Sequence, residues 1–316
     1  MAELKGPLGS MQAQKQLGKT NIFKRRKGKN LVSQYSRPDK KAVYSPSASQ
    51  LDMRQLYNFI VARWQTMSAG EKAVYENDEQ TKKLNISGWN YFLKLCMANP
   101  QEYLKLDYYV SFNQFTGGQI IPAVGTSAPF IPYPSYPDNC PTLENSPNKK
   151  LGKEIVSDGI DDYIATEGTR LVEYYHQDFT VQMIITPKKV VEADGRIFEK
   201  EDLIYIYFLA TGNLLFTKTS SMVEGVKNDY QLNQRYLCSF VFSYTEGKIK
   251  ILVNGILDKE ENTMDEAEPT LNVTMIMLGD NLGFIPSKIA VDELAIFSRS
   301  LSIEEIQKHL RAYKIF

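Results

Sequence analysis

Residues 236–255 read YLCSFVFSYTEGKIKILVNG, and this stretch decides the fold class. Tyr236 to Tyr244 and Lys248 to Val253 are two predicted strands, rich in the β-branched and aromatic residues that favour extended backbone. Thr245-Glu246-Gly247 is short enough to join them as a hairpin. Asn254-Gly255 then supplies a residue pair favoured at the positive φ angles of a type I′ turn. The stretch therefore predicts consecutive antiparallel strands.

The same strand pattern extends over the rest of the C-terminal half. Apolar residues alternate with polar ones in two further segments: Phe179, Val181, Met183 and Ile185, and Leu271, Val273, Met275 and Met277. Leu203 to Leu209 is apolar on both faces and is predicted to be a central strand. Ser302 and Glu305 are expected to cap a short helix from Ile303 to about Tyr313. Short strands separated by turns predict an antiparallel β-sandwich over residues 151–316, so the chain is expected to be mainly β with a small α domain.

Four stretches of this half resemble, in the correct order, successive landmarks of the laminin-G-like jelly-roll family. They are GIDDYI at 159–164, FTV at 179–181, GKIKILVNG at 247–255, and VDELAIF at 291–297 followed by LSIEEI at 301–306. The resemblance implies a concanavalin-A-like sandwich that binds or packs rather than catalyses.

Residues 1–46 are predicted to be an extended basic arm. Between Met1 and Lys41, eleven Lys and Arg residues oppose two acids, Glu3 and Asp39, which leaves a charge of about +9 here and about −9 on the rest of the neutral chain. The apolar side chains are too few to offset the entropy of ordering, so independent folding is not expected. A basic run within the arm is the candidate partner-binding surface: Lys24, Arg25, Arg26, Lys27 and Lys29.

Residues 47–106 are predicted to form a three-helix anchoring unit. Leu51, Leu56, Phe59, Ile60 and Trp64 recur at three- and four-residue steps and mark one face of a first helix. A capping box over residues 68–71 starts the second helix, and a third runs from about residue 89 to 99. A unit of this size has a thin core, so we expect it to dock on another domain or subunit.

Residues 107–150 contain seven prolines and are predicted to be an extended linker. Its aromatic residues leave two interpretations open. The segment is either a semi-rigid spacer or a strap that lies against a protein surface.

Residues from about 15 to 97 are similar to the basic-arm-plus-helices modules of tailed-phage virion genes and related bacterial genes. The similar positions are LGK at 17–19, RRKGK at 25–29, YSRP at 35–38, Arg54, Trp64, Met67-Ser68, Glu71-Lys72, Tyr75 and SGWNYF at 87–92. This resemblance implies a component of a virus particle.

Catalysis is not expected from the residues present. Retaining glucanases place two carboxylates about 5 Å apart, and the Glu-x-Asp-x-x-Glu strand motif of the concanavalin-like glucanases occurs nowhere in the sequence. Glu199, Glu201 and Asp202 come closest, but their charged run predicts a solvated loop. His309 is expected at the surface of the terminal helix, and with His176 as the one other histidine no histidine base or metal cluster is predicted.

Two binding sites are nevertheless candidates in the sandwich. Laminin-G-like domains hold calcium through loop oxygens, and the resemblance points to Asp280, Asn281 and Asp292, although turn chemistry and a strand-end acid explain the same residues. A sugar site needs an exposed aromatic ring beside amide or carboxylate groups, for which Phe284 next to Asn281 is the candidate.

The remaining features concern the compartment. Cys96, Cys140 and Cys238 are odd in number and widely spaced, which predicts neither a disulfide framework nor a zinc site and favours a reducing compartment. No apolar run approaches the length of a membrane helix, and the first residues lack the apolar core of a signal peptide, so we expect neither membrane insertion nor secretion by the usual route.

These patterns favour a non-enzymatic virion structural protein, assembled in the host cytoplasm and capsid-decorating or otherwise at the particle surface. Its arm and helices would anchor it to other virion proteins or to copies of itself, and its sandwich would be displayed. A carbohydrate-binding surface adhesion module is the alternative. A packaging factor that binds nucleic acid through the basic arm is the second alternative, since basic residues neutralise phosphates.

Overall fold

The computed structural model describes residues 16–17, 21–26, 29–34, 47–113, 115–116, 119–125, 129–132, 141–146, 152–157, 164–166, 176–189, 194–200, 204–264, 275–278 and 288–313. The chain divides into two compact units, Met1–Pro46 and Ser47–Phe316.

The first unit contains a three-stranded antiparallel sheet. Its strands are β1 (Gln16–Leu17), β2 (Asn21–Arg26) and β3 (Lys29–Gln34), in that order across the sheet. In the backbone register of β2 with β3, Phe23 is the partner of Val32. The predicted extended arm is therefore corrected over these strands, because backbone pairing orders them locally where composition alone indicated no fold.

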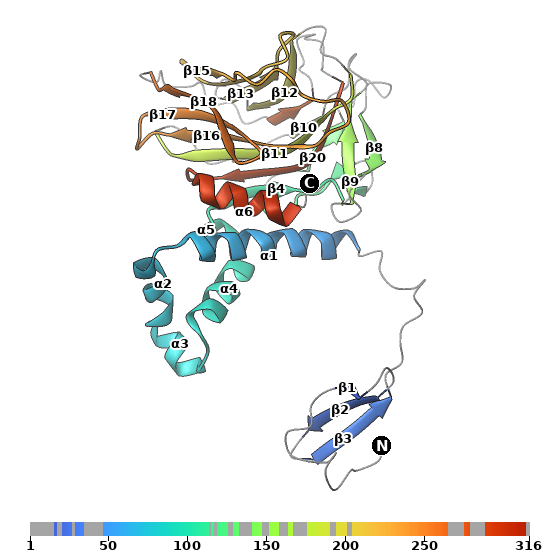
Figure 1. Ribbon diagram of the computed structural model, residues 1–316, viewed down its shortest axis with the longest axis vertical. Helices are drawn as coiled ribbons and strands as arrows, with labels where there is room; N and C mark the ends of the chain where they lie inside the picture. Colours follow the sequence, from blue (N-terminus) through green and yellow to red (C-terminus); the bar gives the residue numbers. More distant parts are fainter. Residues whose placement is uncertain are drawn as a thin grey trace. The chain divides into compact units, whose positions relative to one another are not determined.

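The second unit is a β-sandwich of two antiparallel sheets with helices packed on one of them (Figure 1). One sheet has eight strands in the order β18-β17-β16-β11-β20-β9-β8, with β4 also paired to β20. Its strands are β4 (Leu106–Val110), β8 (Thr142–Asn145), β9 (Lys153–Val156), β11 (Phe179–Pro187), β16 (Tyr236–Ser243), β17 (Lys248–Val253), β18 (Ile256–Asn262) and β20 (Ile289–Phe297). This arrangement confirms the predicted sandwich.

The other sheet has seven strands in the order β15-β14-β13-β12-β19-β10-β7. Its strands are β7 (Ile131–Pro132), β10 (Ile164–Thr166), β12 (Gly195–Lys200), β13 (Ile204–Phe208), β14 (Leu214–Lys218), β15 (Ser221–Glu224) and β19 (Met275–Met277). A separate pair is formed by β5 (Phe115–Thr116) and β6 (Gln119–Ile120). The strand predicted over Leu203 to Leu209 is β13, which has a partner on each side as expected.

The hairpin predicted within residues 236–255 is present. β16 pairs with β17, and β17 pairs with β18 through the two-residue turn Asn254-Gly255. Asn254 has φ 52° and Gly255 has φ 70°, the two positive angles of a type I′ turn. The turn prediction is confirmed.

The side chains of β11 show how the sandwich is built. Phe179, Val181, Met183 and Ile185, the predicted alternating residues, lie in the core that the two sheets share. Ile184 faces the other way and packs in a second core under the helices. Because every residue of β11 is buried, the eight-stranded sheet has an apolar layer on both faces here.

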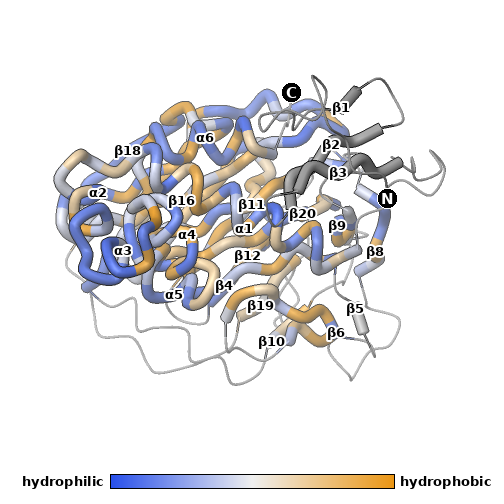
Figure 2. The backbone as a smooth tube through the Cα atoms, turned by 90° about the horizontal axis from the view of Figure 1, so that it is seen from below, coloured by the Kyte–Doolittle hydropathy of each residue, from blue (hydrophilic) through white to orange (hydrophobic). Residues whose placement is uncertain are grey.

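The second unit has six helices among the described residues, some of which cover the outer face of this sheet. They are α1 (Ala48–Thr66), α2 (Ala69–Glu76), α3 (Glu79–Leu84), α4 (Gly88–Ala98), α5 (Pro100–Tyr103) and α6 (Ile303–Tyr313). α1 and α6 lie along the sheet, whereas α2 and α3 project from it (Figure 1) and have mostly hydrophilic sequences (Figure 2). The docking expected of the helical region is therefore achieved within the second unit, on its own sandwich.

Predicted helix caps are borne out by their hydrogen bonds. The Ser68 side chain accepts from the backbone N–H of Glu71, while the Glu71 carboxylate accepts from the Ser68 backbone N–H. The second predicted helix is, however, two helices, because Asn77 ends α2 and Asp78 caps α3. The Asp78 carboxylate accepts from the Gln80 N–H and so caps α3. This cap was not predicted from the sequence.

Of the two interpretations of the proline-rich segment, the described residues fit the strap that lies against a protein surface and not the semi-rigid spacer. β4 is buried along its length and pairs with β20, and β8 pairs with β9. Tyr108 and Phe130 are fully buried against each other in the core, with ring centroids 5.8 Å apart. β7 contains Pro132, which an edge strand tolerates because one row of its backbone groups needs no partner.

Within the described residues, none of the helices combines the length and the apolar character needed to cross a membrane.

We expect Phe59→Ala to lower the free energy of unfolding of the second unit by about 3–5 kcal/mol, the usual cost of emptying an aromatic core position. Phe59 is 2% exposed, and its ring contacts those of Tyr109, Phe297 and Tyr313 across the joint between α1 and the sheet. Urea denaturation measures the change. Val74→Ala, at an exposed position, is the control and should shift the midpoint little. Equal effects of the two substitutions would show that α1 does not stabilise the sandwich.

Candidate binding site and buried charges

Two consecutive acids, Asp292 and Glu293, are buried in β20. The register of β20 against β11 shifts between Met183 and Ile185, so that an extra residue of β20 is accommodated as a bulge. Each acid is 1% exposed. Since a bulge re-aims the side chains of its strand, the two carboxylates reach different partners.

Asp292 belongs to a buried ion network. Its Oδ2 accepts from the Arg235 Nη2 at 2.6 Å and from the Ser146 hydroxyl at 2.8 Å. Arg235 also contacts the Glu154 carboxylate at 3.1 Å, and Lys188 contacts the same carboxylate at 2.8 Å. Burial raises the pKa of Asp292 to about 7, although the Arg235 guanidinium opposes the rise. Two cations therefore compensate the two acids of this network.

Glu293 lies on the helical side of the sheet. The Tyr109 hydroxyl donates to its Oε2, while Oε1 has no hydrogen-bond partner within the described residues. Burial, followed by the neighbouring charge of Asp292, raises the pKa of Glu293 well above its usual range. Glu293 is consequently expected to keep a proton where an exposed glutamate has lost it.

Glu199, one of the three candidate glucanase acids, lies in a different setting from the solvated loop predicted for it. Glu199 is buried in β12, not in a solvated loop, and pairs with Arg196. The Arg196 guanidinium lies 5.1 Å and 5.3 Å from the ring centroids of Tyr205 and Tyr207. Glu201 and Asp202 are outside the described residues. Glu199 is thus held by a cation and is not presented to a substrate.

His309 corrects the surface position predicted for it. The ring is 1% exposed beneath α6, and its Nδ1 is 2.9 Å from the Gln182 Oε1. Burial lowers the pKa of His309 to about 4, so the imidazole is neutral near pH 7. The sequence showed a polar residue on an amphipathic helix, and the packing against Phe59 and Phe297 was visible only in three dimensions.

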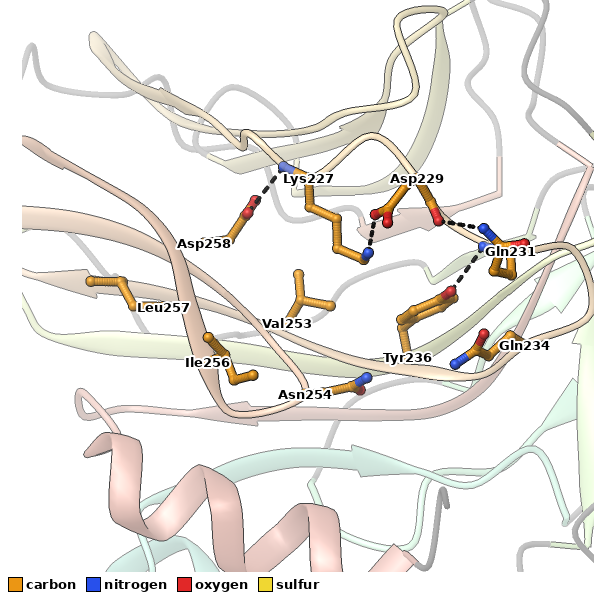
Figure 3. Close-up of a pocket in the computed structure, with 10 residues that line it drawn as sticks. All are labelled: Lys227, Asp229, Gln231, Gln234, Tyr236, Val253, Asn254, Ile256, Leu257 and Asp258. Atoms are coloured by element: carbon orange, nitrogen blue, oxygen red, sulfur yellow. Dashed lines mark hydrogen bonds and ion pairs between the residues drawn. The ribbon is translucent and has the colours of Figure 1, made fainter.

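An open pocket lies where the β15–β16 loop meets the turn between β17 and β18. Its volume is about 400 Å³, within the range of small-molecule sites. Figure 3 shows its lining: Lys227, Asp229, Gln231, Gln234, Tyr236, Val253, Asn254, Ile256, Leu257 and Asp258. Polar groups face it from the loop and the turn, and apolar side chains come from β17 and β18.

Hydrogen bonds hold the walls of this pocket. The Asp258 carboxylate accepts from the backbone N–H groups of Val226 and Lys227 at 3.1 Å and 3.0 Å, which fixes the loop to β18. The Gln231 backbone N–H donates to the Tyr236 hydroxyl at 2.8 Å. Lys227 pairs with Asp229, and this hydrogen-bonded ion pair lowers the pKa of the Asp229 carboxyl.

Residues 158–307 match the family model of the concanavalin A-like lectin/glucanases superfamily. The match confirms the resemblance predicted for the C-terminal half. No curated protein matches the sequence.

Solved structures with a similar fold include botulinum neurotoxin domains. The serotype D binding domain is 15% identical with a TM-score of 0.51, over 66% of this chain and 52% of that chain. The serotype D ligand binding domain in complex with N-acetylneuraminic acid is 14% identical with a TM-score of 0.51, over 66% and 50%. This chain spans about half the length of those structures, and at such identities the likeness shows the fold alone.

The predicted site residues are only partly placed in the concanavalin A-like sandwich. Asp280, Asn281 and Phe284 lie outside the described residues, so the calcium and sugar sites built on them stay predictions. Asp292 is described. It lies inside β20 and not at a strand end, and one oxygen of its carboxylate already accepts from a guanidinium and a hydroxyl. Among the described residues no group of three His, Cys, Asp or Glu side chains could hold a metal ion.

Four of the five predicted partner-binding residues lie in the described strands of the first unit. Lys24, Arg25 and Arg26 lie in β2 and Lys29 in β3, while Lys27 is outside the described residues. The pocket was missed because its residues come from separate segments, 227–236 and 253–258, that meet only in the folded protein. The Asn254-Gly255 turn was the one signal of it, and that turn was interpreted as structural.

Glu293→Gln is expected to stabilise the protein progressively as pH rises. The folded state keeps a proton on Glu293 that the unfolded chain releases near its ordinary pKa of 4.5, so ionisation penalises folding above that pH. Glutamine has no proton to lose, and its advantage should grow by up to about 1.4 kcal/mol per pH unit. Urea unfolding at pH 4, 6 and 8 measures it.

The matched control for this prediction is Glu304→Gln, on an acid whose side chain is 65% exposed and paired with Lys308. Its effect on stability should vary little with pH. A Glu293→Gln difference that does not change between pH 4 and pH 8 would contradict the protonated state assigned to Glu293.

Proposed function

We propose that this protein is a non-enzymatic structural and recognition component of a virion, with its concanavalin A-like sandwich used for binding. The observation that carries the binding role is the burial of three acids of the sandwich, each of which already has a partner within the protein. Glu199, Asp292 and Glu293 are all buried and each has a hydrogen-bonded or ionic partner. A glycosidase needs two carboxylates that reach a substrate, and these three are engaged by the protein itself.

Two features support a place in a particle. The chain consists of a small N-terminal unit and a large one, and the first 41 residues carry eleven of its Lys and Arg residues against two acids. A small, strongly basic unit suits attachment to acidic partner surfaces. The similarity of residues from about 15 to 97 to tailed-phage virion modules points the same way.

Glycan recognition is the second candidate function. The pocket at the β17–β18 turn supports it, because amide, carboxylate and hydroxyl groups stand beside exposed apolar side chains there. A neurotoxin domain of the same fold has been solved in complex with N-acetylneuraminic acid, which makes a sugar a reasonable ligand class to test.

Mass spectrometry of purified particles tests the virion role. The protein should copurify with particles at a constant ratio to the major capsid protein. Replacing the basic residues of β2 and β3 with serine should reduce incorporation at least about tenfold, since charge complementarity speeds and orients docking; the four positions are Lys24, Arg25, Arg26 and Lys29.

The control replaces four cations of the sandwich with serine instead: Lys248, Lys250, Lys259 and Lys308. Incorporation of this variant should stay near that of the unmodified protein. Absence of the protein from particles would overturn the virion role.

We expect no release of reducing sugar when the purified protein is incubated with β-glucans or chitin oligosaccharides. Glu199→Gln serves as the paired variant. Release that is lost in this variant would contradict the non-enzymatic role.

A further inference from the structure

We propose that the pocket formed by the β15–β16 loop and the start of β18 binds a neutral saccharide and selects against anionic sugars. The inference deepens the glycan-recognition role proposed above, to which it adds a site and a ligand class.

The charges of the pocket are already engaged. Lys227 is the one cation among the ten described residues that line it, with Asp229 and Asp258 as the acids. The Lys227 ammonium pairs with Asp229 and lies 5.0 Å and 5.6 Å from the ring centroids of Tyr230 and Tyr236. A sugar carboxylate would have to displace Asp229 from this ammonium in a lining of net negative charge, which disfavours anionic ligands.

Uncharged hydrogen-bonding groups remain for a ligand. Asn254 accepts from the Leu237 backbone N–H through its Oδ1 at 2.9 Å, which leaves its amide N–H₂ to donate. The Tyr236 oxygen accepts from Gln231, so its own proton is left to donate. Gln234, which is exposed at the rim, adds an amide with both donor and acceptor groups (Figure 3). Such mixed groups match sugar hydroxyls, which both donate and accept.

Apolar side chains line the opposite wall. Ile256 is 70% exposed and Leu257 is 42% exposed, although both begin a paired strand. Exposed apolar surface next to hydrogen-bonding groups matches the C–H face and the hydroxyl edge of one sugar ring. Tyr236 is 3% exposed beneath Lys227 and offers no stacking platform, so the apolar contact falls to these aliphatic side chains.

The walls are held before a ligand arrives. Asp258 fixes the loop through two backbone N–H groups, and a Cβ on Gly225 would lie 2.3 Å from the Asp258 carboxylate. A side chain at position 225 would therefore force the Asp258 carboxylate to move. A fixed loop lowers the entropy cost of binding.

The test uses the full chain on an array of neutral and sialylated glycans, followed by calorimetric titration with the strongest neutral saccharide. Three single variants change one wall each: Asp229→Asn, Gln234→Ala and Ile256→Ser. We expect neutral glycans to bind and sialylated ones not to bind. Gln234→Ala and Ile256→Ser should each lower the association constant for the neutral saccharide at least about fivefold, the scale of one hydrogen bond or apolar contact. Asp229→Asn, which releases the Lys227 ammonium from its ion pair, should allow sialylated glycans to bind.

Matched controls make the same chemical changes away from the pocket: Glu304→Gln, Gln80→Ala and Ile303→Ser, all at exposed positions. They should bind within about twofold of the unmodified protein. Unchanged urea denaturation of every variant establishes that the fold is intact.

Three results overturn the proposal: equal or stronger binding of sialylated glycans by the unmodified protein, neutral binding that survives both Gln234→Ala and Ile256→Ser, and no neutral glycan bound at millimolar concentration. Failure of the saccharide proposal can be distinguished from failure of the virion role. A pocket variant still incorporated into particles but unable to bind glycans supports both, whereas glycan binding by a protein absent from particles removes the virion role alone.

Discussion

Burial of β20 along its whole length is the constraint on which the rest of the second unit depends. The strand pairs with β11, β9 and β4, so it joins segments that are almost two hundred residues apart in sequence. Val291 and Leu294 point into the core between the sheets, and Ala295 and Phe297 point into the core under the helices. A strand with two apolar faces requires a cover on each side, and α1 and α6 supply the second cover.

This cover determines where the sandwich can meet a ligand. With α1 and α6 along its outer face, the eight-stranded sheet presents loops and the β18 edge in place of an open face (Figure 1). The described pocket lies at that edge, beside the turn that ends β17. The bulge of β20, in turn, lies at Asp292 and Glu293, which are buried: Asp292 pairs with Arg235, and Glu293 accepts from the Tyr109 hydroxyl.

Local chemistry explains which predictions succeeded. The Asn254-Gly255 turn, the Ser68 cap and the alternation in β11 are each determined by neighbouring residues, and each is present. The spacer interpretation of the proline-rich segment and the surface position of His309 failed because both depend on residues far away in the sequence. Proline disfavours a central strand, but an edge strand tolerates it because one row of its backbone groups has no strand to pair with. β7 is such an edge strand, since it pairs with β10 alone in its sheet.

The sequence by itself determined the strands, their turns and the family resemblance, because periodicity and turn chemistry act over a few residues. Only the tertiary structure decided that β4 joins the sheet, that Asp292 and Glu199 are engaged by arginines, and that residues 227–236 and 253–258 enclose a pocket. These outcomes depend on strand order and on burial, which change the partners and the pKa of a side chain without changing its place in the sequence.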